Sequence, residues 1–352
     1  MKLKGFCALL SVLMVTMLMA ACGDVTSTPQ PAATTSQAAA AATTSQATAA
    51  ATTTQAAAAG GATQIYIPII SKGFQHQFWQ AVKAGAEKAA KEMNVRITFE
   101  GPETEAMVDK QIEMLQTALD KKPQAICLAA LDSKAVIPLL QKAKASNIPV
   151  IGFDSGVDSD IPVTTVATDN VAAAGMAADK MADLIGDKGE VALVVHDQTS
   201  RTGIDRRDGF VNQMKTKHPN ITIVDTQYGA GDQLKSTDIA KAIIQAHPNI
   251  KGLFGANEGS IIGVLNAIKE LNKGGKIVAI GYDSGQQQID AIKSGVEAGA
   301  ITQDPIGIGY KCVDSALKAI KGQTLPKTID TGFHWYDKTT IDSDAIKPLL
   351  YQ

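Results

Sequence analysis

The chain has few aromatic residues and no dominant charge. Its 352 residues include 8 Phe, 6 Tyr and 2 Trp, and the formal net charge is −2 with acidic and basic residues interspersed. No run of Lys and Arg forms the basic patch that nucleic-acid binding needs. The sequence also lacks a glycine-rich phosphate loop and a His/Cys cluster with metal-ligand spacing. We therefore expect no nucleic-acid partner, no metal and no cofactor.

Cysteine is also scarce, with four residues in the whole chain. That number is too small for a disulfide framework in a protein of this length. Cys127 falls in an apolar run typical of a buried strand, and Cys312 falls in a helical pattern. Export would permit a disulfide between them, but we favour two buried thiols that act as small apolar side chains.

The N-terminus has the pattern of an export signal. Two lysines precede an apolar run over residues 6–19, which is short for a membrane span. The run ends in LMAAC, residues 18–22, which resembles a bacterial lipobox. The resemblance implies a signal peptide over residues 1–21 and lipidation of Cys22, which would anchor the exported protein to the outer face of the cell membrane. An ordinary signal peptide with an incidental cysteine is the alternative.

Residues 22–62 consist almost entirely of Ala, Thr, Ser, Gln, Pro and Gly. Such a composition cannot bury enough apolar surface to offset the entropy of the chain. We expect a disordered tether between the anchor and a folded body.

From residue 63 onward, apolar runs alternate with amphipathic helical patterns. Strand patterns cover residues 65–70, 96–100, 125–131, 150–153, 190–195, 221–225, 252–254, 276–282 and 298–302, and the clearest helical patterns cover 108–119, 135–145, 239–246, 261–271 and 308–321. Regular strand–helix–strand order predicts parallel sheets with right-handed crossovers. The length suits two doubly wound α/β domains.

A polar loop over residues 71–77 separates the first strand from the helix that follows it. Phe78 and Trp79 come directly after this loop. In an open α/β sheet, ligands bind at the carboxyl ends of the strands. Two adjacent aromatic side chains at that place predict one half of a ligand clamp, with burial of one of them in the core as the alternative.

Six segments, spread over most of the predicted folded region, resemble the sugar-binding periplasmic-binding-protein family that includes the ribose-binding protein, and the related autoinducer-2 receptors. They are HQFWQAVKAGAEKAAKE, NIPVIGFDS, VATDN, LFGANEGSIIGVLNAI, IVAIGYDSG and ITQDPIGIG. The same fold serves lac-type repressors, but those begin with a helix-turn-helix, and this chain begins with an export signal.

The resemblance implies a type I periplasmic-binding-protein fold: two doubly wound parallel-sheet, flavodoxin-like lobes joined by a three-strand hinge. It implies an N-terminal lobe from residues 63–167 plus 304–330 and a C-terminal lobe from residues 168–303 plus 331–352. The chain would cross between them near residues 167–169, near Gln303 and near residues 328–331. The lobes would close over a small ligand and deliver it to the permease of an ABC importer, and members of this kind suit a monomer.

The resemblance also implies the ligand-binding residues. The family carries ligand contacts at the positions of Asp154, Asn257, Asp283 and Gln303, and an arginine that corresponds within a residue or two to Arg206. A sugar presents an apolar face, on which Phe78 and Trp79 can stack, and an edge of hydroxyls, which carboxylates and amides can bind. Two of these residues have named alternatives: Asp154 could serve as a cap or turn residue, and Arg206 could be a surface charge.

The sequence departs from the ribose-binding pattern at several positions. Ser155 and Gly231 replace an arginine and an aromatic residue, and His76 replaces an asparagine. His76 is a further candidate for ligand binding, with a solvated loop histidine as the alternative. Lys72 and the segment 99–105 are similar to the autoinducer-2 receptors. We therefore expect a different sugar, a deoxysugar, a polyol or a furanosyl signal.

Two other functions compete with import. The receptor could present its ligand to a chemoreceptor or a sensor kinase, since the partner surface is not a motif. An enzyme is less favoured, because the acidic residues and His76 come without a nucleophile elbow or a cofactor loop. At the end of the strand pattern 190–195, His196 and Asp197 could contact the ligand, but we favour a turn.

Overall fold

The computed structural model describes residues 64–351, which contain two six-stranded sheets. The predicted signal peptide, Cys22 and the tether lie outside the described residues. In the first sheet all the strands are parallel, in the order β11-β5-β4-β3-β1-β2. Its elements are β1 (Tyr66–Ile70), α1 (Gln77–Glu92), β2 (Arg96–Glu100), α2 (Val108–Asp120), β3 (Ile126–Leu128), α3 (Ile137–Ala145), β4 (Val150–Phe153), β5 (Thr164–Ala167), α9 (Pro305–Ile320) and β11 (Thr328–Asp330).

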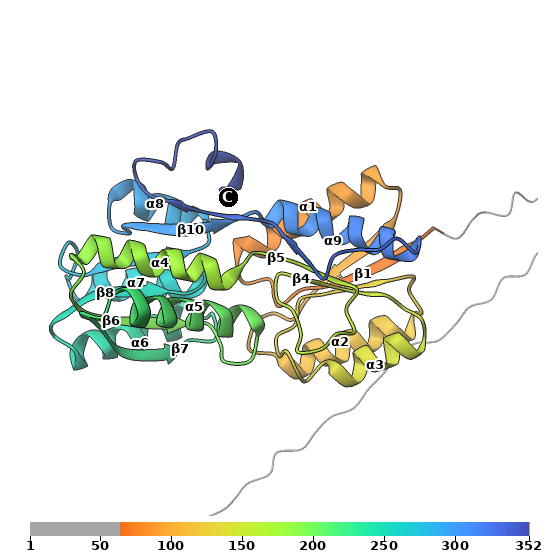
Figure 1. Ribbon diagram of the computed structural model, residues 1–352, viewed down its shortest axis with the longest axis horizontal. Coiled ribbons are helices and arrows are strands. Elements are labelled where there is room, and N and C mark those ends of the chain that lie inside the picture. The colour runs from red at the N-terminus through yellow and green to blue at the C-terminus, as the bar shows by residue number, and fades with distance from the viewer. Residues whose placement is uncertain (1–63, 352) are drawn as a thin grey trace, which may run out of the picture. The chain divides into compact units, whose positions relative to one another are not determined.

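Helices cover both faces of the first sheet. One face packs against α1 and α9, and the other against α2 and α3 (Figure 1). The strands are buried between the two helix layers, so β1 and β4 have no exposed residue. This double burial explains why these strands are apolar runs and not alternating patterns. We call this sheet and its helices the first lobe.

The second lobe is built in the same way around the order β12-β10-β9-β8-β6-β7. Its elements are α4 (Asn170–Ile185), β6 (Gly189–Val195), α5 (Arg201–Lys217), β7 (Ile221–Tyr228), α6 (Gln233–Ala246), β8 (Ile250–Gly255), α7 (Glu258–Glu270), β9 (Val278–Tyr282), α8 (Gln286–Ser294), β10 (Gly299–Gln303), β12 (Phe333–Tyr336) and a 3-10 turn at Lys347–Leu349. Helices α4 and α5 cover one face, and α6 and α7 cover the other. Only the edge strand β12 is antiparallel, pairing with β10.

Three short connections join the lobes. They run from β5 to α4, from β10 to α9 and from β11 to β12. Thr168 in the first connection donates to Gln303 in the second, at 2.9 Å between Oγ1 and Oε1. The Asp169 amide donates to Asp330 in the third, at 3.4 Å. The predicted fold, with two parallel-sheet lobes and a three-strand hinge, is confirmed.

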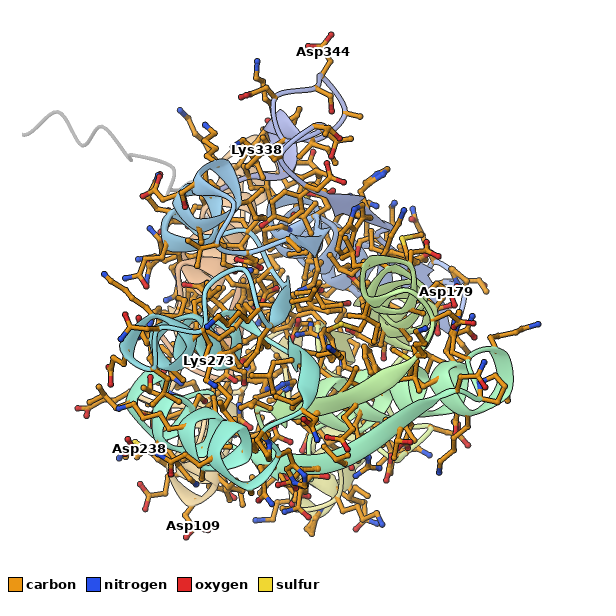
Figure 2. All side chains as sticks on the ribbon, turned by 90° about the vertical axis from the view of Figure 1, so that its left-hand side faces the viewer. Asp109, Asp179, Asp238, Lys273, Lys338 and Asp344 are labelled. Atoms are coloured by element: carbon orange, nitrogen blue, oxygen red, sulfur yellow. The ribbon has the colours of Figure 1, made fainter. Side chains whose placement is uncertain are left out.

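Buried side chains are mostly apolar, and the charged residues cover the surface. Figure 2 shows Asp109, Asp238 and Asp344 projecting away from the protein. Cys127 and Cys312 are both buried and free, with Cys127 Sγ 3.7 Å from the Cys312 carbonyl oxygen, so the prediction of two buried thiols is confirmed. None of the helices between residues 64 and 351 combines the length and the apolar content that a bilayer crossing needs.

Candidate functional site

The polar residues singled out in the sequence follow the carboxyl ends of strands in both lobes. In the first lobe Asp154 directly follows β4, and in the second lobe Asp283 directly follows β9. Both residues have left-handed backbone conformations, with φ of +54° and +84°. This conformation is uncommon for a residue other than glycine and is typical of functional sites. It ends each strand with a sharp change of direction.

The two lobes meet face to face around one cavity. Gln75 of the first lobe donates to the Gly231 carbonyl of the second at 3.4 Å, and Thr199 of the second donates to the Leu131 carbonyl of the first at 3.1 Å. The cavity that remains between the lining side chains has a volume of about 20 Å³. It is lined by Lys72, His76, Phe78, Trp79, Glu105, Asp154, His196, Thr202, Arg206, Asn257, Asp283 and Gln303. All eight residues proposed from the sequence are in this set, and their contact with a ligand stays a prediction.

Phe78 and Trp79 form an aromatic wall of the cavity. They lie in the first turn of α1 and not in the loop before it. Their rings are 5.0 Å apart and nearly perpendicular, and the indole N–H donates to Glu105 at 2.8 Å. Both rings also belong to the core of the first lobe. Each ring is therefore anchored in the core while it lines the cavity, and the role of the pair as a ligand clamp stays a prediction.

Arg206 is buried, whereas its neighbour Arg207 is only partly buried and pairs with Asp208. The Arg206 Nε donates to Asn170 at 2.8 Å, and its Nη1 donates to the Ala256 carbonyl at 2.9 Å. The guanidinium carbon lies 3.6 Å from the centre of the Tyr282 ring, a cation–π arrangement. The surface alternative for Arg206 is therefore wrong.

Asp283 and Gln303 form a hydrogen-bonded pair at the base of the cavity. Gln303 Nε2 donates to Asp283 Oδ1 at 2.7 Å, and the amide of Glu258 donates to Asp283 Oδ2 at 2.9 Å. Asn257 caps α7, accepting from the Ser260 amide at 2.9 Å. These bonds fix the orientation of each side chain before a ligand arrives, which lowers the entropic cost of binding.

Sequence reasoning did not propose Lys72 as a ligand-site residue. Its ammonium lies 3.6 Å from Glu105 in the first lobe and 3.6 Å from Asp197 in the second. Burial alone would lower the pKa of Lys72, but the two carboxylates outweigh it and raise the pKa. The same charge holds the pKa of Glu105 and of Asp197 at about 2, against the effect of burial. The signals in the sequence were a lysine close behind an apolar strand and the similarity of this region to the autoinducer-2 receptors.

The hydrogen bonds around His76 fix its neutral tautomer. Its Nε2 lies 3.2 Å from the side-chain nitrogen Nε2 of Gln75 and 3.5 Å from the side-chain nitrogen Nδ2 of Asn257. The orientation of both amides is set elsewhere, because Gln75 Oε1 accepts from the Glu105 amide and Asn257 Oδ1 accepts from the Ser260 amide. The His76 Nε2 therefore faces two donors and must accept. The proton lies on Nδ1, which has no partner among residues 64–351.

His196 lines the cavity, and Asp197 makes the predicted turn. The Asp197 carboxylate accepts from the amides of Thr199 and Ser200 at 2.9 and 2.7 Å. Burial lowers the pKa of His196 to about 3, with Lys72 acting in the same direction. The imidazole is therefore neutral at physiological pH.

Four lining groups keep unused hydrogen-bonding capacity. Within the described residues, no side chain or amide binds the Asp154 carboxyl oxygens or the Arg206 Nη2, and the His76 Nδ1 and the His196 Nδ1 are also unpartnered. Buried polar groups normally have partners, and leaving one without is costly. The site is therefore suited to a small ligand that carries several hydroxyl groups, since each hydroxyl both donates and accepts.

Asp154 makes the stability of the protein sensitive to pH. Burial raises its pKa to about 7, although Lys72 and Arg206 oppose this. Between pH 4.5 and 7 the folded protein holds a proton that the unfolded chain has released, so this carboxyl lowers stability as the pH rises. Relative to the wild type, Asp154→Asn is expected to gain at least about 1 kcal/mol in free energy of unfolding over this range, with no further gain above pH 7. Denaturant titrations of both proteins without ligand, over a series of pH values, measure this difference in stability. If the two stability profiles run parallel across this pH range, the prediction is wrong.

A polar, aromatic-walled cavity between two hinged α/β lobes defines a two-lobed receptor for a small solute. The chain belongs to the periplasmic binding proteins, since residues 67–324 match the family model described as "Periplasmic binding protein domain". Proteins of this family bind their solutes outside the cytoplasm and are not enzymes, so the chain is an exported binding protein.

Curated relatives and solved structures agree with this assignment. The chain is 27% identical to the D-allose-binding periplasmic protein of Escherichia coli over 73% of this chain and 86% of that protein. A carbohydrate transporter solute-binding protein from Agrobacterium radiobacter, solved with D-arabinose, is 33% identical with a TM-score of 0.80, covering 82% of this chain and 99% of that one. An ABC transporter solute-binding protein from Agrobacterium vitis, bound with α-D-tagatopyranose, is 32% identical with a TM-score of 0.78. The match covers 82% of this chain and 100% of that one.

Proposed function

We propose that the protein captures a monosaccharide or a closely related polyol between its two lobes and delivers it to the permease of an ABC importer. The observation that carries this proposal is the unused hydrogen-bonding capacity of Asp154, Arg206 and His76 in a cavity with an aromatic wall. Phe78 and Trp79 supply apolar surface for the C–H face of a sugar ring. The relatives solved with D-arabinose and α-D-tagatopyranose support the same class of ligand.

The charges in the cavity favour a neutral ligand. The Lys72 ammonium is already compensated by Glu105 and Asp197, and the Arg206 guanidinium lies among acidic side chains. An additional ionic group on the ligand would have no compensating partner and would be costly to bury. A sugar carries no ionic group and meets this requirement.

The two-lobed division supports capture by hinge closure. We propose that residues 63–167 with 304–330 move as one body and residues 168–303 with 331–352 as the other. The three connections at Thr168, Gln303 and Asp330 are held to one another by hydrogen bonds, so they can bend together. A monomer is sufficient for this mechanism, because both walls of the cavity come from one chain.

A thermal-shift screen of the protein against pentoses, hexoses, deoxysugars, polyols and autoinducer-2 tests the function. A ligand present at about a hundred times its dissociation constant adds about 2.7 kcal/mol to the free energy of unfolding. We expect at least one sugar to raise the melting temperature and to be recovered chemically unchanged. A response confined to nucleosides or peptides would contradict the carbohydrate assignment.

We also propose that the exported protein is anchored through a lipid on Cys22, with residues 22–62 as the tether. Cys22→Ala is expected to abolish lipidation and to leave the precursor uncleaved, because the acylated sulfur is lost. Metabolic labelling with a fatty acid in the producing bacterium, followed by mass measurement of the N-terminus, checks this result. Acylation of the Ala variant at the wild-type level would contradict the anchor.

A further inference from the structure

Two helix N-termini at the contact between the lobes lack caps of their own. The residue before α1 is His76, whose side chain makes no capping hydrogen bond, and the residue before α8 is Gly285, which has no side chain. The first amides of a helix have no partner within the helix and need one from elsewhere. In five other helices, the side chain of the residue before the helix accepts from one of these first amides; the five residues are Asp169, Ser200, Asp232, Asn257 and Asp304.

The missing caps come from the opposite lobe. Glu258 of the second lobe accepts from the amides of Gln77 and Phe78 at 3.1 and 3.2 Å, one on each carboxylate oxygen. In return, Gln77 Oε1 of the first lobe accepts from the Gln286 amide at the start of α8, at 2.7 Å. Each lobe thus caps a helix of the other. When the lobes separate, all three hydrogen bonds must break together.

Glu258 is well placed for this role and does not line the cavity. Its side chain is buried, and its own amide donates to Asp283, one of the lining residues. A carboxylate at the N-terminus of α1 is also favoured by the helix dipole. Because α1 carries Phe78 and Trp79 in its first turn, holding that turn places the aromatic wall over the ligand.

We propose that Glu258 and Gln77 form a reciprocal latch that sets the population of the closed state and positions the aromatic wall, without touching the ligand. Only the effect of this latch on sugar affinity rests on the proposed function. A ligand that binds the closed state has an apparent affinity proportional to the population of that state. Weakening the latch therefore lowers affinity as the closed population falls, and it speeds release because the closed lobes open more often.

Amide hydrogen exchange of the full chain, resolved for single residues and recorded without sugar, tests the latch. Glu258→Gln removes the charge and turns an N–H group toward one of the two amides. We expect exchange at Gln77, Phe78 and also Gln286 to become at least fivefold faster, although the cap of Gln286 is chemically untouched. Glu87→Gln is the control, since Glu87 is an exposed carboxylate on α1.

Gly285→Ala provides a second, independent variant. A Cβ at this position would lie 2.8 Å from Gln77 Oε1 and 3.1 Å from Glu258 Oε1, so the methyl group pushes the latch apart while both of its side chains remain. The Gly285 backbone has φ of −70°, which alanine adopts without strain. We expect the same three amides to exchange faster.

If only Gln77 and Phe78 exchange faster in Glu258→Gln, the carboxylate is a local cap and the latch is overturned. Unchanged exchange at all three amides in both variants would also overturn the latch. In the sugar assay, the variants should dissociate faster than the wild type by the factor seen in exchange. If the wild type binds no sugar, the proposed function fails, whereas the exchange result still decides the latch.

Discussion

Asp283→Ala is expected to weaken sugar binding by about a hundredfold, which corresponds to about 2.8 kcal/mol. The carboxylate accepts from Gln303 and from the Glu258 amide, and it lines the cavity. Hydrogen bonds to a charged group contribute roughly 1.5–3 kcal/mol each. The alanine variant would lose the proposed ligand contact and would also release the Gln303 side chain from its fixed orientation.

Isothermal titration calorimetry with the sugar found in the screen measures this effect. Asp283→Asn should fall between the wild type and the alanine variant, because it keeps the shape and one acceptor. Asp238→Ala, at an exposed position of α6, should bind like the wild type. If Asp283→Ala also binds like the wild type, the ligand does not occupy this cavity.

Trp79→Ala is expected to reduce both the stability of the first lobe and the affinity for sugar. The side chain is 1% exposed and packs against Phe78 and Phe153. Replacing a buried tryptophan by alanine costs about 3–5 kcal/mol in free energy of unfolding. The substitution also leaves Glu105 Oε1 without its donor, which disturbs the carboxylate that compensates Lys72.

Trp79→Phe separates the two effects. Phenylalanine keeps an aromatic ring in the core but cannot donate to Glu105. We expect this variant to remain folded at 37 °C and still to lose at least tenfold in affinity. Denaturant titration and calorimetry provide the two readouts. Wild-type affinity in a folded Trp79→Phe variant would restrict Trp79 to a role in the core.

Strand positions were well predicted because double burial leaves a clear mark in the sequence. The strand at Val150–Phe153, in which every residue is buried, has the bounds expected from its apolar and β-branched residues. Helix starts were harder. Helix α6 begins at Gln233 and not at residue 239, because its first turn is polar and is held by the Asp232 cap. Apolar periodicity cannot detect a helix turn of that kind.

The candidate site was predicted where a residue ends a strand, as at Asp154 and Asp283. The sequence could not place Lys72 beside Glu105 and Asp197, because the first contact joins separate segments of the first lobe and the second depends on how the two lobes meet. It also could not decide whether Arg206 faces the cavity or the surface, since this depends on the rotation of α5. The reciprocal caps between α1 and α8 depend on the same contact between the lobes.

A crystal structure of the protein with its sugar tests the account most directly. We predict that the sugar lies between the lobes, with its ring against Phe78 or Trp79 and its hydroxyls within hydrogen-bond distance of the Asp154 carboxyl, Arg206 Nη2 and His76 Nδ1. These groups, like His196 Nδ1, have unused hydrogen-bonding capacity in the structure. A sugar bound elsewhere, for example in the groove lined by Ile262, Leu265 and Val296, would contradict the central claim.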